Sequence, residues 1–160
     1  MNKIAVISHD AGGAEIISHW LKKQNKLYST VLKGPAIKVF RNNNIKLHNN
    51  DLKKAISYAD LIITGTSWQS NIEKEAIYLS KKIGKYSITF LDHWVNYEER
   101  FIFNGELILP NEIWVTDEFA YKIAKSIFKK TIIKIKPNYY LLNLNKIIKA
   151  KSINNKGKFC

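Results

Sequence analysis

Short apolar runs alternate with helical patterns along most of this chain. Between the runs, apolar residues recur three or four positions apart, as in Ala14, Ile17 and Leu21, which is the spacing of a helix. The alternation predicts βαβ units, so we expect an α/β fold, a doubly wound, mostly parallel Rossmann-like sheet of about seven strands. The expected strands are Lys3–Ser8, Tyr28–Leu32, Ile45–Leu47, Leu61–Thr64, Ser87–Leu91, Glu112–Val115 and Ile132–Ile135.

The length of 160 residues suits one domain with a real core, and a hydrophobic content of 46% is not that of a disordered chain. We expect a Rossmann-like domain over residues 1–140, followed over residues 141–160 by a C-terminal helix and linker. The helix is expected at Leu141–Ala150, and Lys151–Lys158 is rich in the polar and small residues typical of linkers. Such a linker would lead to a second domain.

The sequence favours a cytoplasmic protein. No apolar run approaches the roughly 20 residues of a membrane span, and the apolar stretch after Lys3 ends too soon for a signal peptide. Cys160 is the one cysteine, so neither an internal disulfide nor a cysteine metal cluster can form within the sequence. We expect no bound metal and no resident cofactor.

The net charge of +13 is that of a basic protein, and it bears on the choice of partner. Nearly all of the positive charge is lysine, because Arg41 and Arg100 are the only arginines. Arginine supplies the bidentate contacts to bases and phosphates, so its scarcity disfavours a nucleic-acid partner. Peripheral contact with an anionic membrane, such as the inner membrane, fits the lysines better.

The loop after the first strand is the first candidate ligand site. In an open α/β sheet, ligands bind at the carboxyl ends of the strands. There His9 can act as an acid or base and Asp10 can accept a hydrogen bond, while Gly12 and Gly13 open a helix whose N-terminus suits an anion. The spacing is not G-x-G-x-x-G, which disfavours a dinucleotide cofactor. The same glycines also allow a tight turn without any ligand.

The loop Gly65–Ser70, after the fourth expected strand, is the second candidate. The hydroxyls of Thr66 and Ser67 precede a helix and suit an anion or a polyol, and Trp68 can stack on a sugar or a base. Helix capping by Ser70 and packing of Trp68 beneath the loop are the alternatives.

The loop Asp92–Arg100, after the fifth expected strand, is the third candidate. Asp92 beside His93 can orient an imidazole, and Arg100 can hold a phosphate or pair with a neighbouring glutamate. Asn96 and Tyr97 are further expected ligand contacts. The alternative is a buried polar network. The sequence lacks the motifs of zincins, P-loop hydrolases, thiol redox proteins and α/β-hydrolases.

The order of these motifs resembles the N-terminal half of the two-Rossmann (GT-B) proteins, which include nucleotide-sugar glycosyltransferases and non-hydrolysing sugar-nucleotide 2-epimerases. The resemblance rests on Gly12–Gly13, Thr64–Ser67 and Asp92–Tyr97, and on Ile113–Glu118 followed by Lys136–Tyr140. It implies that a C-terminal domain holds most of the nucleotide. The N-terminal domain would then offer the acceptor site and a glycine loop near the donor phosphates.

The resemblance implies the acceptor-side domain of a glycosyltransferase-like protein of surface polysaccharide or glycan biosynthesis. The substrate would be a nucleotide-sugar, and the partners a glycan acceptor with a second Rossmann domain or a second copy of the chain. The base would be His9 or Asp10, or else Asp92 with His93. The epimerase pattern His-x-Glu-Ala-Gly has no counterpart here, which disfavours epimerisation. A non-catalytic module that binds a small anion or nucleotide is the alternative.

Overall fold

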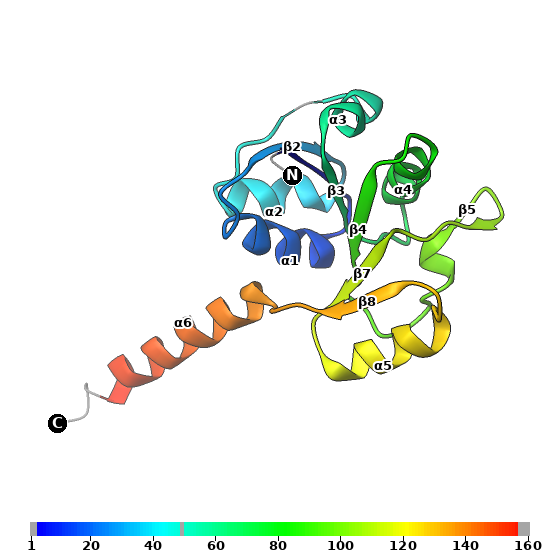
Figure 1. The fold of residues 1–160 in the computed structure, drawn as a ribbon. Helices are drawn as coiled ribbons and strands as arrows, with labels where there is room; N and C mark the ends of the chain where they lie inside the picture. The colour runs from blue at the N-terminus through cyan, green and yellow to red at the C-terminus, as the bar shows by residue number, and fades with distance from the viewer. Residues whose placement is uncertain (1–2, 49, 157–160) are drawn as a thin grey trace.

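A parallel sheet forms the centre of the computed structural model, which describes residues 3–48 and 50–156 (Figure 1). Six strands pair in the order β2-β1-β3-β4-β7-β8, and every pair is parallel. The expected α/β class is therefore confirmed. The strands are β1 (Lys3–Ser8), β2 (Leu27–Leu32), β3 (Leu61–Thr64), β4 (Tyr86–Phe90), β7 (Glu112–Val115) and β8 (Ile132–Ile135).

Helices cover both faces of this sheet. Buried side chains of α1 and α2 pack on one face, and those of α3, α4 and α5 pack on the other. A short antiparallel hairpin, β5 with β6, follows a single 3-10 turn in the long connection between β4 and β7. These elements are α1 (Ala11–Leu21), α2 (Pro35–Asn42), α3 (Leu52–Tyr58), α4 (Ile72–Lys82), η1 (Glu99–Phe101), β5 (Ile102–Phe103), β6 (Glu106–Leu107), α5 (Glu118–Ile127) and α6 (Tyr139–Lys156).

Several element ends follow from local side-chain chemistry. The Asp51 carboxylate accepts the Lys54 N–H at the start of α3, and the Asp117 carboxylate accepts the Ala120 N–H at the start of α5. After α4, the chain turns at Gly84 with a φ of 68°, a conformation that glycine adopts without strain. The side chains of Asp51 and Asp117 therefore cap α3 and α5.

Two sequence-based expectations differ from the structure. Ile45–Leu47 is not a strand, because Ile45 turns its side chain into the core below α2 and its N–H bonds the Phe40 carbonyl. The expected linker at Lys151–Lys158 is helical as far as Lys156, since α6 continues without a break. Gly157 and Lys158 lie outside the described residues.

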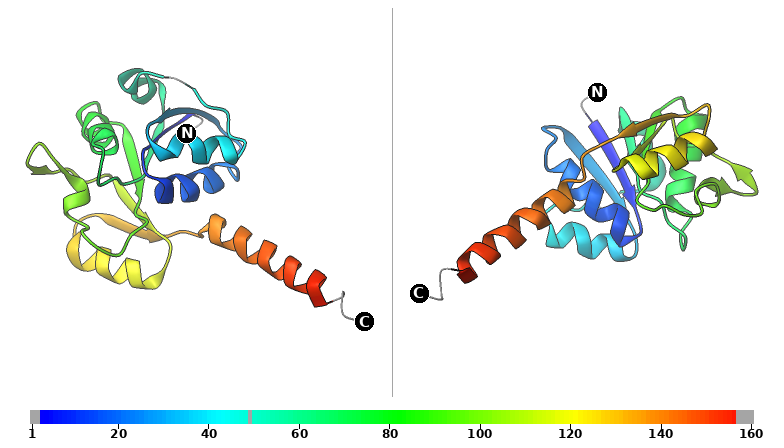
Figure 2. Two further views of the ribbon diagram at one scale, coloured as in Figure 1. Left: turned by 180° about the vertical axis from the view of Figure 1, so that it is seen from behind. Right: turned by 90° about the horizontal axis from the view of Figure 1, so that it is seen from below.

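The α6 helix extends away from the sheet in Figure 1 and in both views of Figure 2. Its first residues contact α1 and the turn that follows it: the Tyr140 ring centroid lies 5.4 Å from that of His19, and Lys23 Nζ lies 6.0 Å from the Tyr139 ring centroid. Within the described part of the chain, no helix is both long and apolar enough to cross a membrane.

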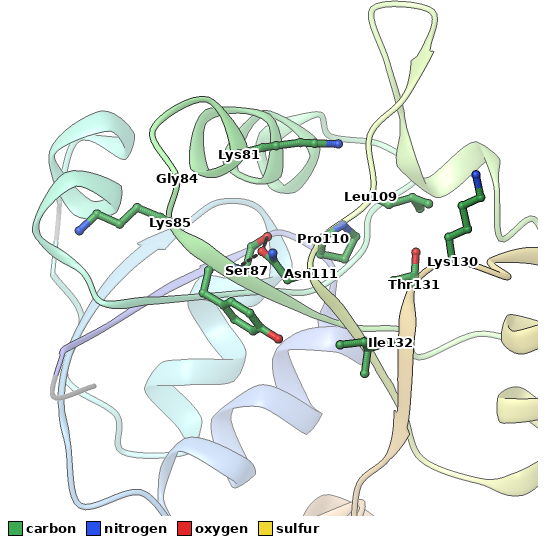
Figure 3. Close-up of a pocket in the computed structure, with 11 residues that line it drawn as sticks. Lys81, Gly84, Lys85, Ser87, Leu109, Pro110, Asn111, Lys130, Thr131 and Ile132 are labelled. Carbon is green, nitrogen blue, oxygen red and sulfur yellow. Dashed lines mark hydrogen bonds between the residues drawn. The ribbon is translucent and has the colours of Figure 1, made fainter.

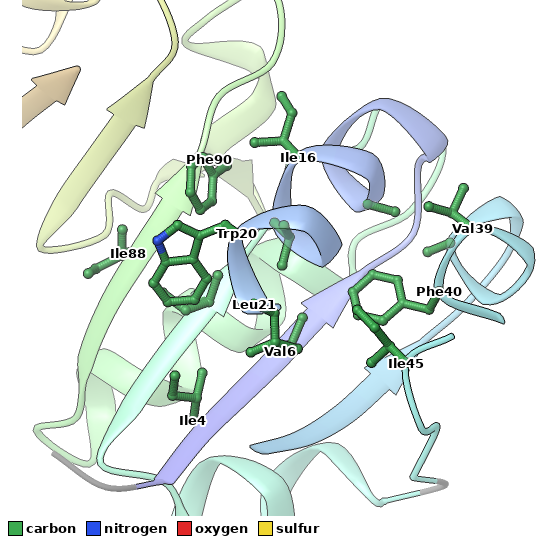
Figure 4. Close-up of a cluster of buried hydrophobic side chains, with 14 of the residues drawn as sticks. Ile4, Val6, Ile16, Trp20, Leu21, Val39, Phe40, Ile45, Ile88 and Phe90 are labelled. Atoms are coloured by element: carbon green, nitrogen blue, oxygen red, sulfur yellow. The ribbon is translucent and has the colours of Figure 1, made fainter. Parts of the chain in front are cut away.

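An aromatic cluster anchors the face of the sheet that α1 covers. Phe90 is fully buried, and its ring meets Trp114 edge-on at 5.1 Å and Trp20 at 6.0 Å between centroids. Figure 4 shows Trp20 of α1 lying over Phe90 and Ile88 of β4. Such edge contacts add to the free energy gained by burying large rings. The cluster therefore fixes α1, and with it the loop that precedes α1, over the sheet.

Replacing Phe90 by alanine is expected to lower the free energy of unfolding by about 3 to 5 kcal/mol, because it removes a buried ring and leaves a cavity. Urea unfolding followed by circular dichroism measures this loss. The control is Tyr58→Ala, since the Tyr58 side chain is 75% exposed and should change stability by about 0.5 kcal/mol or less. Equal losses in the two variants would contradict the assignment of Phe90 to the core.

Candidate functional site

The sheet has a topological switch point between β1 and β3. From β1 the chain leaves to β2 on one side and returns to β3 on the other, so the connections diverge between these two strands. Ligands of open α/β sheets bind at the carboxyl end of such a point. The loops that follow β1 and β3 meet there, and the loop after the adjacent β4 joins them.

The contact between the first two loops is one of backbone on backbone. A Cβ added to Gly13 would lie 3.4 Å from the Gly65 Cα, and both glycines are buried. Gly12 is exposed, but a Cβ there would collide with Asp92 Oδ2. Gly13 and Gly65 thus pack the loops together, whereas Gly12 presents its backbone at the start of α1.

Asp10 is the centre of a polar cluster on these two loops. Its Oδ1 lies 2.7 Å from His9 Nδ1 and accepts a hydrogen bond of 2.8 Å from Ser67 Oγ. Partial burial favours the neutral acid, but the bonds from His9 and Ser67 and the Trp68 backbone outweigh it and lower the pKa of Asp10. Asp10 is therefore an ionised acceptor with a side chain 25% exposed.

The His9 ring is largely enclosed. Its side chain is 17% exposed, and a Cβ on Gly34 would come within 2.6 Å of Nε2. Gly34 has a φ of 52°, so glycine suits both its backbone and the space that the ring needs. This packing makes His9 a less accessible base than its place in the sequence indicates.

Glu73, in the first turn of α4, is a buried carboxyl that the sequence analysis did not single out. Its Oε1 accepts the His9 N–H at 2.7 Å, and its Oε2 makes no hydrogen bond within the described residues. The side chain is 1% exposed, and burial raises the pKa of Glu73 to about 7 despite the backbone N–H bonds that lower it. The group that holds the first loop therefore titrates near neutral pH.

The third loop is tied to the second by a buried polar network. Thr66 Oγ1 donates to Asp92 Oδ1 at 3.2 Å, and Arg100 Nη1 donates to Thr66 Oγ1 at 3.2 Å. Arg100 Nε also donates to the Val95 carbonyl. Burial raises the pKa of Asp92. The opposing effects of His93, Arg100 and Thr66 are smaller, so the pKa lies above its usual value. Arg100 thus fixes the loop through Thr66 and Val95, and it is 6% exposed.

His93 is the imidazole that combines a carboxylate partner with access to solvent. Its Nε2 lies 3.4 Å from Asp92 Oδ2, and its side chain is 43% exposed whereas that of Asp92 is 3% exposed. A carboxylate on one ring nitrogen orients the ring and leaves the other nitrogen for a substrate. The pair matches the arrangement of a base with an orienting acid.

An exposed aromatic surface lies beside this pair and joins two loops. Trp94 Nε1 donates to Asp117 Oδ2 at 3.2 Å, and the Trp94 ring lies 6.4 Å from Phe119 between centroids. Trp94 is 59% and Phe119 63% exposed. Since Asp117 also caps α5, the indole is held in place while its ring stays open. Sequence reasoning missed this surface because Phe119 looks like an ordinary helix residue.

The remaining expected ligand contacts differ in their exposure to solvent. Trp68 is 59% exposed and so does not pack beneath its loop; it lines a shallow cavity of about 300 Å³ with Lys74 of α4. Asn96 is exposed. Tyr97 lies in the core, 2% exposed and stacked on Phe128, and burial raises its pKa to about 12. Tyr97 therefore lies away from the surface that a ligand would reach.

Among residues 3–48 and 50–156, no group of three or more His, Cys, Asp or Glu side chains is arranged to hold a metal ion.

Comparison with known proteins identifies a likeness of fold. No protein-family model matches the sequence, and no curated protein matches it. Among solved structures, the chain is similar to S. aureus MnaA in its co-structure with UDP, with a TM-score of 0.63 and 13% sequence identity. The match covers 87% of this chain and 46% of that chain. The likeness shows a shared Rossmann-like fold over about half of that protein.

Replacing Glu73 by glutamine is expected to stabilise the protein relative to the wild type, and to do so more at pH 7 and above than at pH 4. A raised folded pKa means that the native state loses stability as pH rises from 4.5 to about 7, by about 3 kcal/mol in all. Glutamine keeps the acceptor for the His9 N–H but removes this loss. Urea unfolding of both proteins from pH 4 to 8 measures the difference.

The matched control for this experiment is Glu75→Gln, which makes the same substitution at a half-buried position of the same helix. A stability difference between Glu73→Gln and the wild-type protein that stays constant over the whole pH range would show that Glu73 titrates normally.

Proposed function

We propose that this chain is the acceptor-side domain of a glycosyltransferase-like protein that acts on a nucleotide-sugar. The observation that carries the proposal is the open His93 imidazole backed by the buried Asp92, at the edge where three hydrogen-bonded loops meet. The likeness of fold to half of a protein solved with UDP supports the nucleotide-sugar part of the proposal.

His93 acts as the general base in the proposed reaction. Its Nε2 faces Asp92, so Nδ1 takes the proton of an acceptor hydroxyl. The acceptor oxygen then bonds to the anomeric carbon of the donor sugar, and the nucleoside diphosphate leaves with the electron pair of the broken bond. The Asp92 carboxylate stabilises the imidazolium that forms. A positioned base of this kind contributes roughly 100-fold to 10,000-fold to a rate.

The surroundings of His93 offer contacts for both substrates. Trp94 and Phe119 present exposed aromatic faces on which an acceptor sugar ring can lie. Asp10, held ionised by its neighbours, can accept a hydrogen bond from a sugar hydroxyl. The exposed backbone of Gly12 at the start of α1 favours the negative charge of the leaving diphosphate.

The proposal extends to a second domain, a pathway and a location in the cell. A second Rossmann domain or a second copy of this chain would supply the rest of the donor site. This fits the comparison, in which the match covers 46% of the similar chain. A role in surface polysaccharide or glycan biosynthesis, in the cytoplasm and at the inner membrane, would use the lysine-rich surface to approach an anionic bilayer.

One observation favours a non-catalytic module that binds a nucleotide or small anion. The hydrogen bonds of Thr66 link it to Asp92 and to Arg100, so these side chains bond one another. This arrangement suits a rigid frame that presents backbone groups to a ligand and catalyses no reaction. In this alternative His93 contacts the ligand but transfers no proton.

Replacing His93 by asparagine is expected to lower sugar transfer by about 100-fold or more and to leave the affinity for UDP unchanged. Release of UDP from a UDP-sugar in the presence of a glycan acceptor measures transfer by the natural full-length protein, and calorimetry measures UDP binding. His19→Asn, on α1 and bonded to the Glu15 carbonyl, is the matched control.

Full transfer by the His93→Asn variant would remove His93 as the base. Binding of UDP by a wild-type protein that transfers no sugar would instead support the non-catalytic module.

A further inference from the structure

A second cavity lies at the opposite edge of the sheet from the candidate site. It has a volume of about 540 Å³ and opens at the amino ends of β4, β7 and β8 (Figure 3). This volume is within the range of pockets that bind small organic ligands. Three connections form its walls: the turn from α4 to β4, the segment before β7, and the turn before β8. The function proposed above does not use this cavity.

The charged residues that line the cavity are all positive. Lys81, Lys85 and Lys130 line it, and no acidic residue does so among the described residues. Lys85 Nζ is occupied by the Ala59 carbonyl at 2.7 Å. Lys81 and Lys130 form no ion pair within the described residues. Two unpaired ammonium groups from different elements, both visible in Figure 3, therefore border one hollow.

Neutral donors at the base of the cavity are already oriented. Asn111 Oδ1 accepts hydrogen bonds from Ser87 N at 2.9 Å and from Ser87 Oγ at 3.3 Å. Since the carbonyl oxygen is used in this way, the Asn111 amide group is fixed and its Nδ2 is left to donate. Thr131 adds a hydroxyl to the same lining.

Apolar surface completes the lining. Leu109, Pro110 and Ile132 lie beside the polar groups, so one part of the hollow suits an organic ring and another suits an anion. Lysine binds phosphate as a compact point charge, and two lysines match the double charge of a phosphate monoester.

We propose that this cavity binds a small organic phosphate. Lys81 and Lys130 neutralise the phosphate, Asn111 donates a hydrogen bond to it, and the organic part lies on Leu109, Pro110 and Ile132. The site is separate from the His93 site, because the two occupy opposite edges of the sheet.

The test uses AMP and pyrophosphate as probes of the full chain, followed by amide chemical shifts in NMR. Shift changes are expected at Lys85–Ser87 and Asn111. The double variant Lys81→Ala/Lys130→Ala should weaken both probes at least tenfold. Ile132→Ser should weaken AMP alone, since pyrophosphate has no organic part. Citrate, an anion without phosphate, should bind at least tenfold more weakly than pyrophosphate.

The matched control is Lys122→Ala/Lys125→Ala, which removes the same charge from exposed positions of α5. Equal weakening in the two double variants would reduce the effect to the overall basic charge and overturn the proposal. Shift changes confined to Asp10–Gly12 and Asp92–Asn96 would overturn it as well, by placing the anion at the other edge. If Lys81→Ala/Lys130→Ala lost stability but still bound both probes, the lysines would serve to stabilise the ends of helices and the proposal would be overturned.

Discussion

The contact between Gly13 and Gly65 is the constraint on which the rest of the carboxyl edge depends. Neither position carries a side chain, so the first turn of α1 and the loop after β3 approach until their backbones touch. That approach brings Ser67 within hydrogen-bond distance of Asp10 and places Thr66 where Asp92 can reach it. An alanine Cβ at Gly13 would just contact the Gly65 backbone, but a larger side chain there would separate the loops, and the polar network that links them would lose its geometry.

The fold was predictable wherever local chemistry determines structure. The period of the apolar residues separates helix from strand, and Asp51 and Asp117 mark helix starts because a cap involves only the next few residues. Ile45–Leu47 shows where such reasoning stops. A run of this length can pair with the open edge of β2, but here the core below α2 takes Ile45, and the His48 backbone bonds the Thr30 side chain instead of the β2 backbone.

The candidate site was predictable as a set of loops but not as a set of roles. Strand order alone brings the three loops to one edge. Whether a side chain faces solvent or the core depends on packing between distant segments, which is why Arg100 and Tyr97 are buried and His93 is open. Glu73 illustrates the same limit, since a glutamate in the first turn of a helix ordinarily faces water.

The strand order also bears on how the chain can assemble as it leaves the ribosome. β1 pairs with β2, the next strand to be made, and β3 then adds to the other side of β1. Each later strand of the sheet adds beside the strand made before it, so β4, β7 and β8 extend a growing edge in order of synthesis. Each strand of this sheet can therefore pair with one already made or with the next to be made, and none depends on a partner that is translated much later.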